Sequence, residues 1–387
     1  MNRRAWLQLS SFSTVATFAG CGGSKVPEID QETYAEEITA VIKQHAEICS
    51  AAYKSAWQTA DSLRAKANVF LTTPTSATHV ALQDAWIVAH NAYMETEGLR
   101  GQGTPADGVH SNIASWPVDP TALDTVPGNL KTGVVHDTKG MPTIDAQAIR
   151  LAHQPRENKV LMGFHAIEFL IYGFDQYDDA PGPRVFADYT AVVGVKRRRE
   201  LLSLLTQLLP IDLAVMNEAW HPSEQGNYRA QFMEKDPKSA LTTIFTGLVT
   251  VCNNGLSGAL LRPLASGDQK DEICQFSDTS LDAVRHAIIG LQKTLTGKAP
   301  GRVVADDEVP LLGLIAKADA SIAKEIESGF EQMIDKLKPL NEPFDQLIKP
   351  GHSGRKALEE VADGLSDQAK LLVQVGKAVG AKLGSLA

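Results

Sequence analysis

Apolar residues recur at three- and four-residue spacing along most of this 387-residue chain, and this pattern restricts the fold more than any other feature. Such spacing places apolar side chains on one face of an α-helix, whereas a half-buried strand needs strict alternation. Alternating runs are short, as in 193–196 and 301–305. We therefore predict an all-α fold. The long segments that carry the helical pattern are 35–71, 77–99, 195–220, 240–265, 307–340 and 354–386.

Gly, Pro and Asp are concentrated in three breaks between these segments, at 101–108, 119–133 and 175–184. Because these residues favour turns, and the third break lies near the middle of the chain, we predict two helical bundles, 30–180 and 185–387.

The chain carries a net charge of -9 and lacks the basic character typical of proteins that bind nucleic acids, so a nucleic-acid partner is not expected. We expect the basic run Lys-Arg-Arg-Arg at 196–199 to lie on a solvated helix face.

The N-terminus has the features of a bacterial export signal. Arg3 and Arg4 precede a modestly apolar stretch that ends in Phe-Ala-Gly-Cys at Cys21, and this ending resembles a lipobox. We predict a signal peptide over 1–20, lipidation of Cys21 and a tether over 21–29. The protein would then be anchored to a membrane of the bacterial cell envelope, in the periplasm or at the outer membrane, after export by the Sec or twin-arginine route. The alternative is an ordinary secretory signal cleaved near Cys21.

Three further cysteines, Cys49, Cys252 and Cys274, remain after Cys21 is assigned to lipid. A Cys252–Cys274 disulfide is one option in an oxidising compartment. The chain has no Cys-x-x-Cys pair, which argues against a zinc finger or a thioredoxin-like site.

Residues 161–173, LMGFHAIEFLIYG, place His165 and Glu168 in a run suited to burial. A helix that is apolar all round is buried, and a buried carboxylate costs several kcal/mol unless it is paired. Glu168 therefore needs a metal ion, a cation or a hydrogen-bond network as its partner. Gly163 lowers helix propensity, which indicates that another backbone or a ligand passes close to it.

GFHAIEFLIYGFD resembles the Gly-x-His-x-x-Glu motif of the imelysin family, which comprises exported or lipid-anchored bacterial helical proteins often linked to iron. Five further segments resemble the family in the same order, so that the resemblance covers most of 55–348. They are the helix with Trp86, Tyr93, Glu97 and Arg100, the loop with Trp116, Pro117 and Asp119, the pair Tyr228 and Arg229, the helix start in 276–297, and the Pro-Phe-Asp segment in 339–348.

The resemblance implies two four-helix-type bundles with the motif residues gathered at their interface. His165 and Glu168 are then the expected metal ligands, with Glu97 as the candidate third ligand, although Glu97 could instead pair with Arg100. Ser277 and Asp278 are either motif residues of the site or the N-cap of the following helix. Gly163, Trp116 and Arg100 are the other motif residues expected there.

One segment departs from the family. Family members can read Glu-His-Ser-Cys-Phe-Ser-Asp-Asn-Thr-His before the later helix, whereas this chain reads Glu-Ile-Cys-Gln-Phe-Ser-Asp-Thr-Ser-Leu over 272–281. Both histidines are missing, so a metal site that depends on them would be incomplete here.

Three functions follow as hypotheses. The favoured one is an envelope lipoprotein that binds a divalent or ferric metal ion, iron before zinc, with iron-uptake components as partners. The second is a metal-dependent peptidase, but His-x-x-Glu provides no evident general base and the pattern His-Glu-x-x-His is absent. The third is a metal-free ligand-binding or scaffold lipoprotein.

Overall fold

The computed structural model describes residues 26–100, 105–129, 131–177, 179–190, 194–302 and 308–384. Within these ranges the regular structure is helical, and the β-type pairing consists of two isolated bridges, Val126–Asn129 and Gln154–Lys159. The predicted all-α fold is confirmed. The predicted signal peptide and Cys21 lie outside the described residues.

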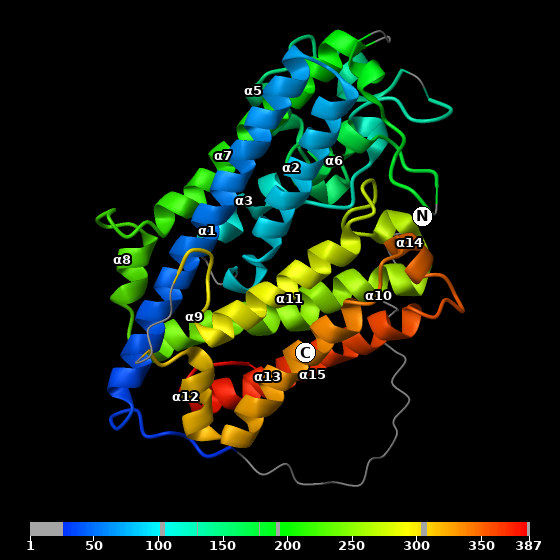
Figure 1. Cartoon of the computed structure of the whole chain (residues 1–387). Helices are drawn as coiled ribbons and strands as arrows, with labels where there is room; N and C mark the ends of the chain where they lie inside the picture. Colours follow the sequence, from blue (N-terminus) through cyan, green and yellow to red (C-terminus); the bar gives the residue numbers. More distant parts are fainter. Residues whose placement is uncertain are drawn as a thin grey trace.

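A first group of helices surrounds α1, the longest helix of the described chain (Figure 1). α1 packs along α2 on one side and α7 on another, while α3 and α6 pack against α7. α7 follows the break at 175–184 and was expected in the second bundle, yet it lies against α1. The helices of this group are α1 (Ala35–Thr72), α2 (Ser76–Met94), α3 (Pro105–Ala114), α4 (Gly133–His136), α5 (Ala146–Ala152), α6 (Phe164–Tyr172) and α7 (Val195–Ala219).

A second group lies below the first in Figure 1 and is organised around α15. α15 packs on α9, α10 and α13, and α11 packs on α13. The short helix α8 (Tyr228–Met233) precedes this group and packs on α1. The helices of the group are α9 (Pro237–Thr250), α10 (Ser257–Ser266), α11 (Ser280–Thr296), α12 (Leu311–Ala318), α13 (Ala320–Leu337), α14 (Phe344–Leu347) and α15 (Arg355–Ala378).

Two of the expected long helices are interrupted. The 240–265 segment contains a π-helical turn, η6 (Val251–Leu256), between α9 and α10. Segment 307–340 breaks at Asp319, whose carboxylate accepts hydrogen bonds from the backbone N–H groups of Ser321 and Ile322 and so starts α13. Asp is one of the residues that N-cap positions prefer. The π-helical turn η6 is of a kind that often occurs at functional sites.

Two helical stretches, Val195–Ala219 and Pro237–Ser266, are long and apolar enough to cross a membrane. More than half of the most apolar window of each is buried inside the protein, at 56% and 61%. Their apolar character is therefore accounted for by the core of the two helix groups.

The end of α2 joins the two groups. Residues 95–100, which include the 3₁₀ turn η2 (Glu97–Leu99), lie against α9 and α11. Gly290 of α11 makes this approach feasible, because a Cβ there would lie 2.2 Å from the carbonyl oxygen of Glu95. The Glu95 carboxylate in turn accepts hydrogen bonds from His286 and Lys293 at 3.1 and 2.6 Å. This junction fixes the position of Glu97 and Arg100.

Candidate functional site

Helix α6 carries the His-x-x-Glu pair and is buried along its whole length. Gly163 immediately precedes it with φ +87°, and a Cβ on Gly163 would lie 2.4 Å from the carbonyl oxygen of Ile113. The predicted close approach at Gly163 is confirmed, and the neighbour is the backbone of α3. Gly163 lies just outside the helix, however, so it causes no loss of helix propensity.

The buried carboxylate of Glu168 is paired by a hydrogen-bond network. Its Oε1 accepts from the backbone N–H groups of Phe276 and Ser277, both at 3.0 Å, and from the Ser277 hydroxyl at 2.7 Å. Its Oε2 lies 3.1 Å from Nδ1 of His165. Both oxygens are therefore engaged, and the carboxylate orients the His165 imidazole through its contact with Nδ1.

Ser277 and Asp278 do not cap the following helix. α11 begins at Ser280 after Thr279, which makes no side-chain cap bond, so the N-cap interpretation is wrong. Asp278 instead takes the left-handed conformation, with φ +57°, and its carboxyl hydrogen-bonds that of Asp175. Burial and the neighbouring Asp175 raise the pKa of Asp278 to about 8, so the pair retains a proton at neutral pH.

This pair predicts a pH dependence of stability. The pKa of Asp278 is about 8 in the folded protein and near its ordinary value in the unfolded chain, so only the folded state binds this proton between about pH 4 and 8. The contribution of this proton to the free energy of unfolding is therefore complete below about pH 4 and is lost as the pH rises toward 8. The Asn side chain of an Asp278→Asn variant cannot titrate. Its urea concentration at the midpoint of unfolding, measured at about pH 5, 6.5 and 8, should therefore fall less steeply with rising pH than that of the wild type. Parallel pH profiles for the two proteins would contradict this assignment.

Four of the expected site residues line one cavity of about 170 Å³. These are His165, Glu97, Arg100 and Trp116, and the far wall is formed by the π-turn and α10, including Asn254 and Arg262. The cavity thus lies between elements of the first helix group and elements of the second. The other expected site residues, Gly163, Glu168, Ser277 and Asp278, do not line it.

Within the cavity, Glu97 pairs with Arg100 at 2.5 Å. Burial alone would lower the pKa of Arg100, but the Glu97 carboxylate reverses this and raises it. The Glu97–Arg100 pairing considered from the sequence is thus present, and the Glu97 carboxylate can serve an ion only if Arg100 releases or shares it. Nearby, the Arg262 guanidinium lies 4.7 Å from the centre of the Trp116 ring.

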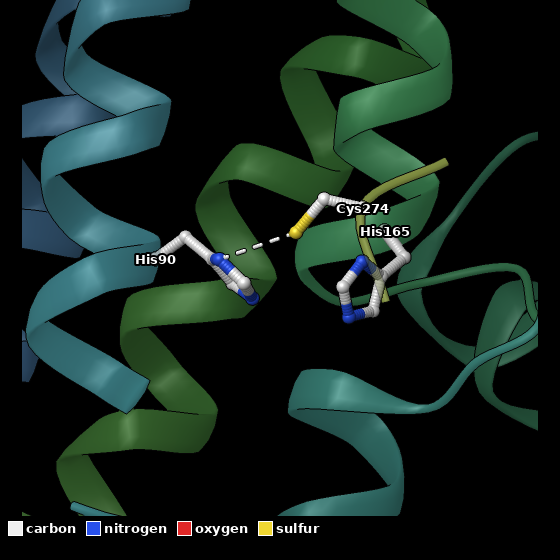
Figure 2. A group of neighbouring side chains, drawn as sticks. All are labelled: His90, His165 and Cys274. Carbon is white, nitrogen blue, oxygen red and sulfur yellow. Dashed lines mark hydrogen bonds between the residues drawn. The ribbon is translucent and has the colours of Figure 1, made fainter. Parts of the chain in front are cut away.

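Two residues that the sequence analysis did not assign, His90 and Cys274, lie beside His165 (Figure 2). Potential ligand atoms of the three side chains lie within 4.8 Å of one another, and all three side chains are buried. The Cys274 thiol lies 3.7 Å from Nδ1 of His90. Burial raises the pKa of Cys274 well above, and lowers the pKa of His90 well below, the ordinary values, so both groups are neutral without an ion.

The sequence contains a pattern that could have indicated a buried position for His90. Trp86, His90 and Tyr93 follow one another at four and three residues, which places His90 on the buried face of α2, where its ring stacks on Trp86 at 4.9 Å. From the sequence, Cys274 was considered only as an optional disulfide partner of Cys252, and in the structure both cysteines are free thiols.

Comparisons with known proteins agree with this architecture. An iron-regulated protein A precursor from Parabacteroides distasonis matches with a TM-score of 0.68 and 15% identity, over 93% of this chain and 98% of that one. An imelysin-like protein from Psychrobacter arcticum matches with a TM-score of 0.62 and 18% identity, over 93% and 99%. At these identities the likeness shows the fold. No curated protein matches the chain. The family model for imelysin, peptidase M75, matches residues 49–372, and the chain therefore belongs to the imelysin family.

Proposed function

We propose that this imelysin-family protein is a lipid-anchored envelope protein that binds a metal ion, iron before zinc, at His165 and acts in iron uptake or homeostasis. The predicted lipidation of Cys21 supports the envelope location. The iron-regulated protein A precursor that shares the fold supports the link to iron.

The orientation of His165 is the observation that carries the proposal. Glu168 engages Nδ1 at 3.1 Å, and the same imidazole lines the cavity, which leaves Nε2 for an ion. Histidines that bind metals typically donate their other N–H to a carboxylate, which fixes the tautomer and strengthens the ligand. The Phe276 and Ser277 donors hold Glu168 in turn, so the imidazole is positioned before any ion arrives.

The peptidase alternative needs a general base beside a metal-bound water. Glu97 is the carboxylate that shares the cavity wall with His165, and it is engaged by Arg100. The geometry therefore favours binding over hydrolysis. Chelator-sensitive cleavage of an unfolded protein substrate by the purified protein would reverse this preference.

The test is metal binding by purified variants. We expect the wild type to bind one equivalent of Fe²⁺ under anaerobic conditions and His165→Ala to bind none, because the central ligand is lost. Glu168→Gln should bind about 10–100-fold more weakly, because the ligand remains but its orienting carboxylate does not. The measurement is elemental analysis after desalting, together with a binding titration.

His221→Ala is the control, because His221 is a half-buried histidine that lies outside the cavity wall. It should bind like the wild type. Circular dichroism must show that each variant retains its helices. A folded wild-type protein that takes up neither iron nor zinc would leave the metal-free ligand-binding alternative in place of the proposal.

A further inference from the structure

We infer that His90 and Cys274 join His165 as ligands, so that the site is a two-histidine, one-thiolate centre for a divalent cation such as Fe²⁺ or Zn²⁺ and not for Fe³⁺. This inference rests on the proposed function because His165 is common to both. It adds two ligands and restricts the class of ion.

The three donors come from separate parts of the fold. His90 lies in α2, His165 in α6, and Cys274 in the segment that precedes α11 (Figure 2). Their ligand atoms lie within 4.8 Å of one another, whereas ligands around a tetrahedral ion are roughly 3.5 Å apart. A contraction of about 1 Å would therefore complete the site, which lies within the reach of side-chain rotation.

Without an ion, one ring nitrogen of His90 lacks a hydrogen-bond partner among the described residues. Among the described residues its buried Nε2 has no hydrogen-bond partner, while its Nδ1 faces the Cys274 thiol. Buried polar groups usually have partners, and one that has none needs a physical explanation. A metal ion bound to Nε2 of His90 and to the Cys274 thiolate would supply that explanation, with the thiol proton released to solvent.

Charge balance favours a divalent ion. The Cys274 thiolate would contribute one negative charge in direct contact, and Glu168 contributes a second behind His165. Thiolate and imidazole donors suit Zn²⁺ and Fe²⁺, whereas Fe³⁺ prefers oxygen donors. Three protein ligands leave a fourth position for water or a ligand from the cavity that His165 lines.

The experiment uses Co²⁺ as a spectroscopic probe of the full-length, reduced protein. At one equivalent we expect the visible bands of tetrahedral Co²⁺ and a near-ultraviolet thiolate-to-cobalt charge-transfer band. Cys274→Ser should lose the charge-transfer band, and His90→Ala should bind Co²⁺ about tenfold more weakly or worse. Zn²⁺ should displace Co²⁺ and should bind more tightly than Fe²⁺ in vitro, so the preference for iron in the proposed function refers to metal availability in the cell and not to intrinsic affinity.

Cys252→Ser is the matched control, since Cys252 is also a buried free thiol but belongs to the π-turn. It should keep the charge-transfer band. The wild-type spectrum tests the inference even if Cys274→Ser does not fold. Co²⁺ binding without a thiolate band, or uptake of Fe³⁺ or Cu⁺ alone, would overturn the inference and leave metal binding at His165 intact. Failure to bind any ion would overturn the proposed function as well.

Discussion

A Gly163→Ala variant is expected to lose about 3–5 kcal/mol of its free energy of unfolding. Gly163 has φ +87° and ψ -173°, a backbone region that is open essentially to glycine alone. The added methyl group would also lie 2.4 Å from the carbonyl oxygen of Ile113 and 2.7 Å from that of Asn112. Both oxygens belong to the backbone of α3, so relief requires α6 to move away from α3 and to displace His165.

Urea unfolding followed by circular dichroism measures this loss. Gly108→Ala is the matched control, because Gly108 lies in α3 itself and a Cβ there meets no atom within 4 Å among the described residues. That substitution should stabilise the protein by up to about 1 kcal/mol through helix propensity. A Gly163→Ala variant that unfolds at the wild-type urea concentration would show that the α3–α6 contact is adaptable.

An Asp124→Ala variant is expected to lose a similar amount, about 3–5 kcal/mol, because it leaves buried positive charge without a partner. Asp124 is fully buried. Its Oδ1 accepts a hydrogen bond from Arg198 at 3.1 Å, and its Oδ2 accepts one from Arg184 at 3.2 Å. His136 approaches the same carboxylate at 3.6 Å. Removal of the carboxylate would leave both guanidinium groups in a low-dielectric environment.

Asp367→Asn provides the comparison for this second prediction. Asp367 pairs with Lys370 at 2.7 Å, but both side chains are about two-thirds exposed. Water screens such a surface pair, so its loss should change stability by less than about 0.5 kcal/mol. Equal urea midpoints for the Asp124 and Asp367 variants would mean that the buried cluster does not stabilise the fold.

The Asp124 cluster also corrects an expectation from the sequence. The basic run at 196–199 was expected on a solvated helix face, yet Arg198 is buried against Asp124 and Arg197 donates hydrogen bonds to the backbone carbonyls of Val134 and Met141. The partners lie more than 50 residues earlier in the chain. A local charge pattern cannot reveal partners that only the packing of α7 onto the preceding loops brings close.

The sequence alone determined the features that depend on local pattern. Apolar spacing predicted the helices, because side-chain periodicity is set by the helical backbone itself. The apolar run around His165 and Glu168 predicted a buried helix, and desolvation required a partner for the carboxylate. The glycine before the pair indicated a close approach, which the α3 backbone makes.

Only the tertiary structure decided which groups meet. The partner of Glu168 is Ser277, 109 residues further along the chain, and Cys274 meets His90 across 184 residues. No periodicity encodes such pairs, because they depend on how α2, α6 and the segment before α11 pack together. The helices could thus be predicted from local chemistry, whereas the neighbours of His165 follow from long-range packing, and they include the two further ligands that we propose, His90 and Cys274.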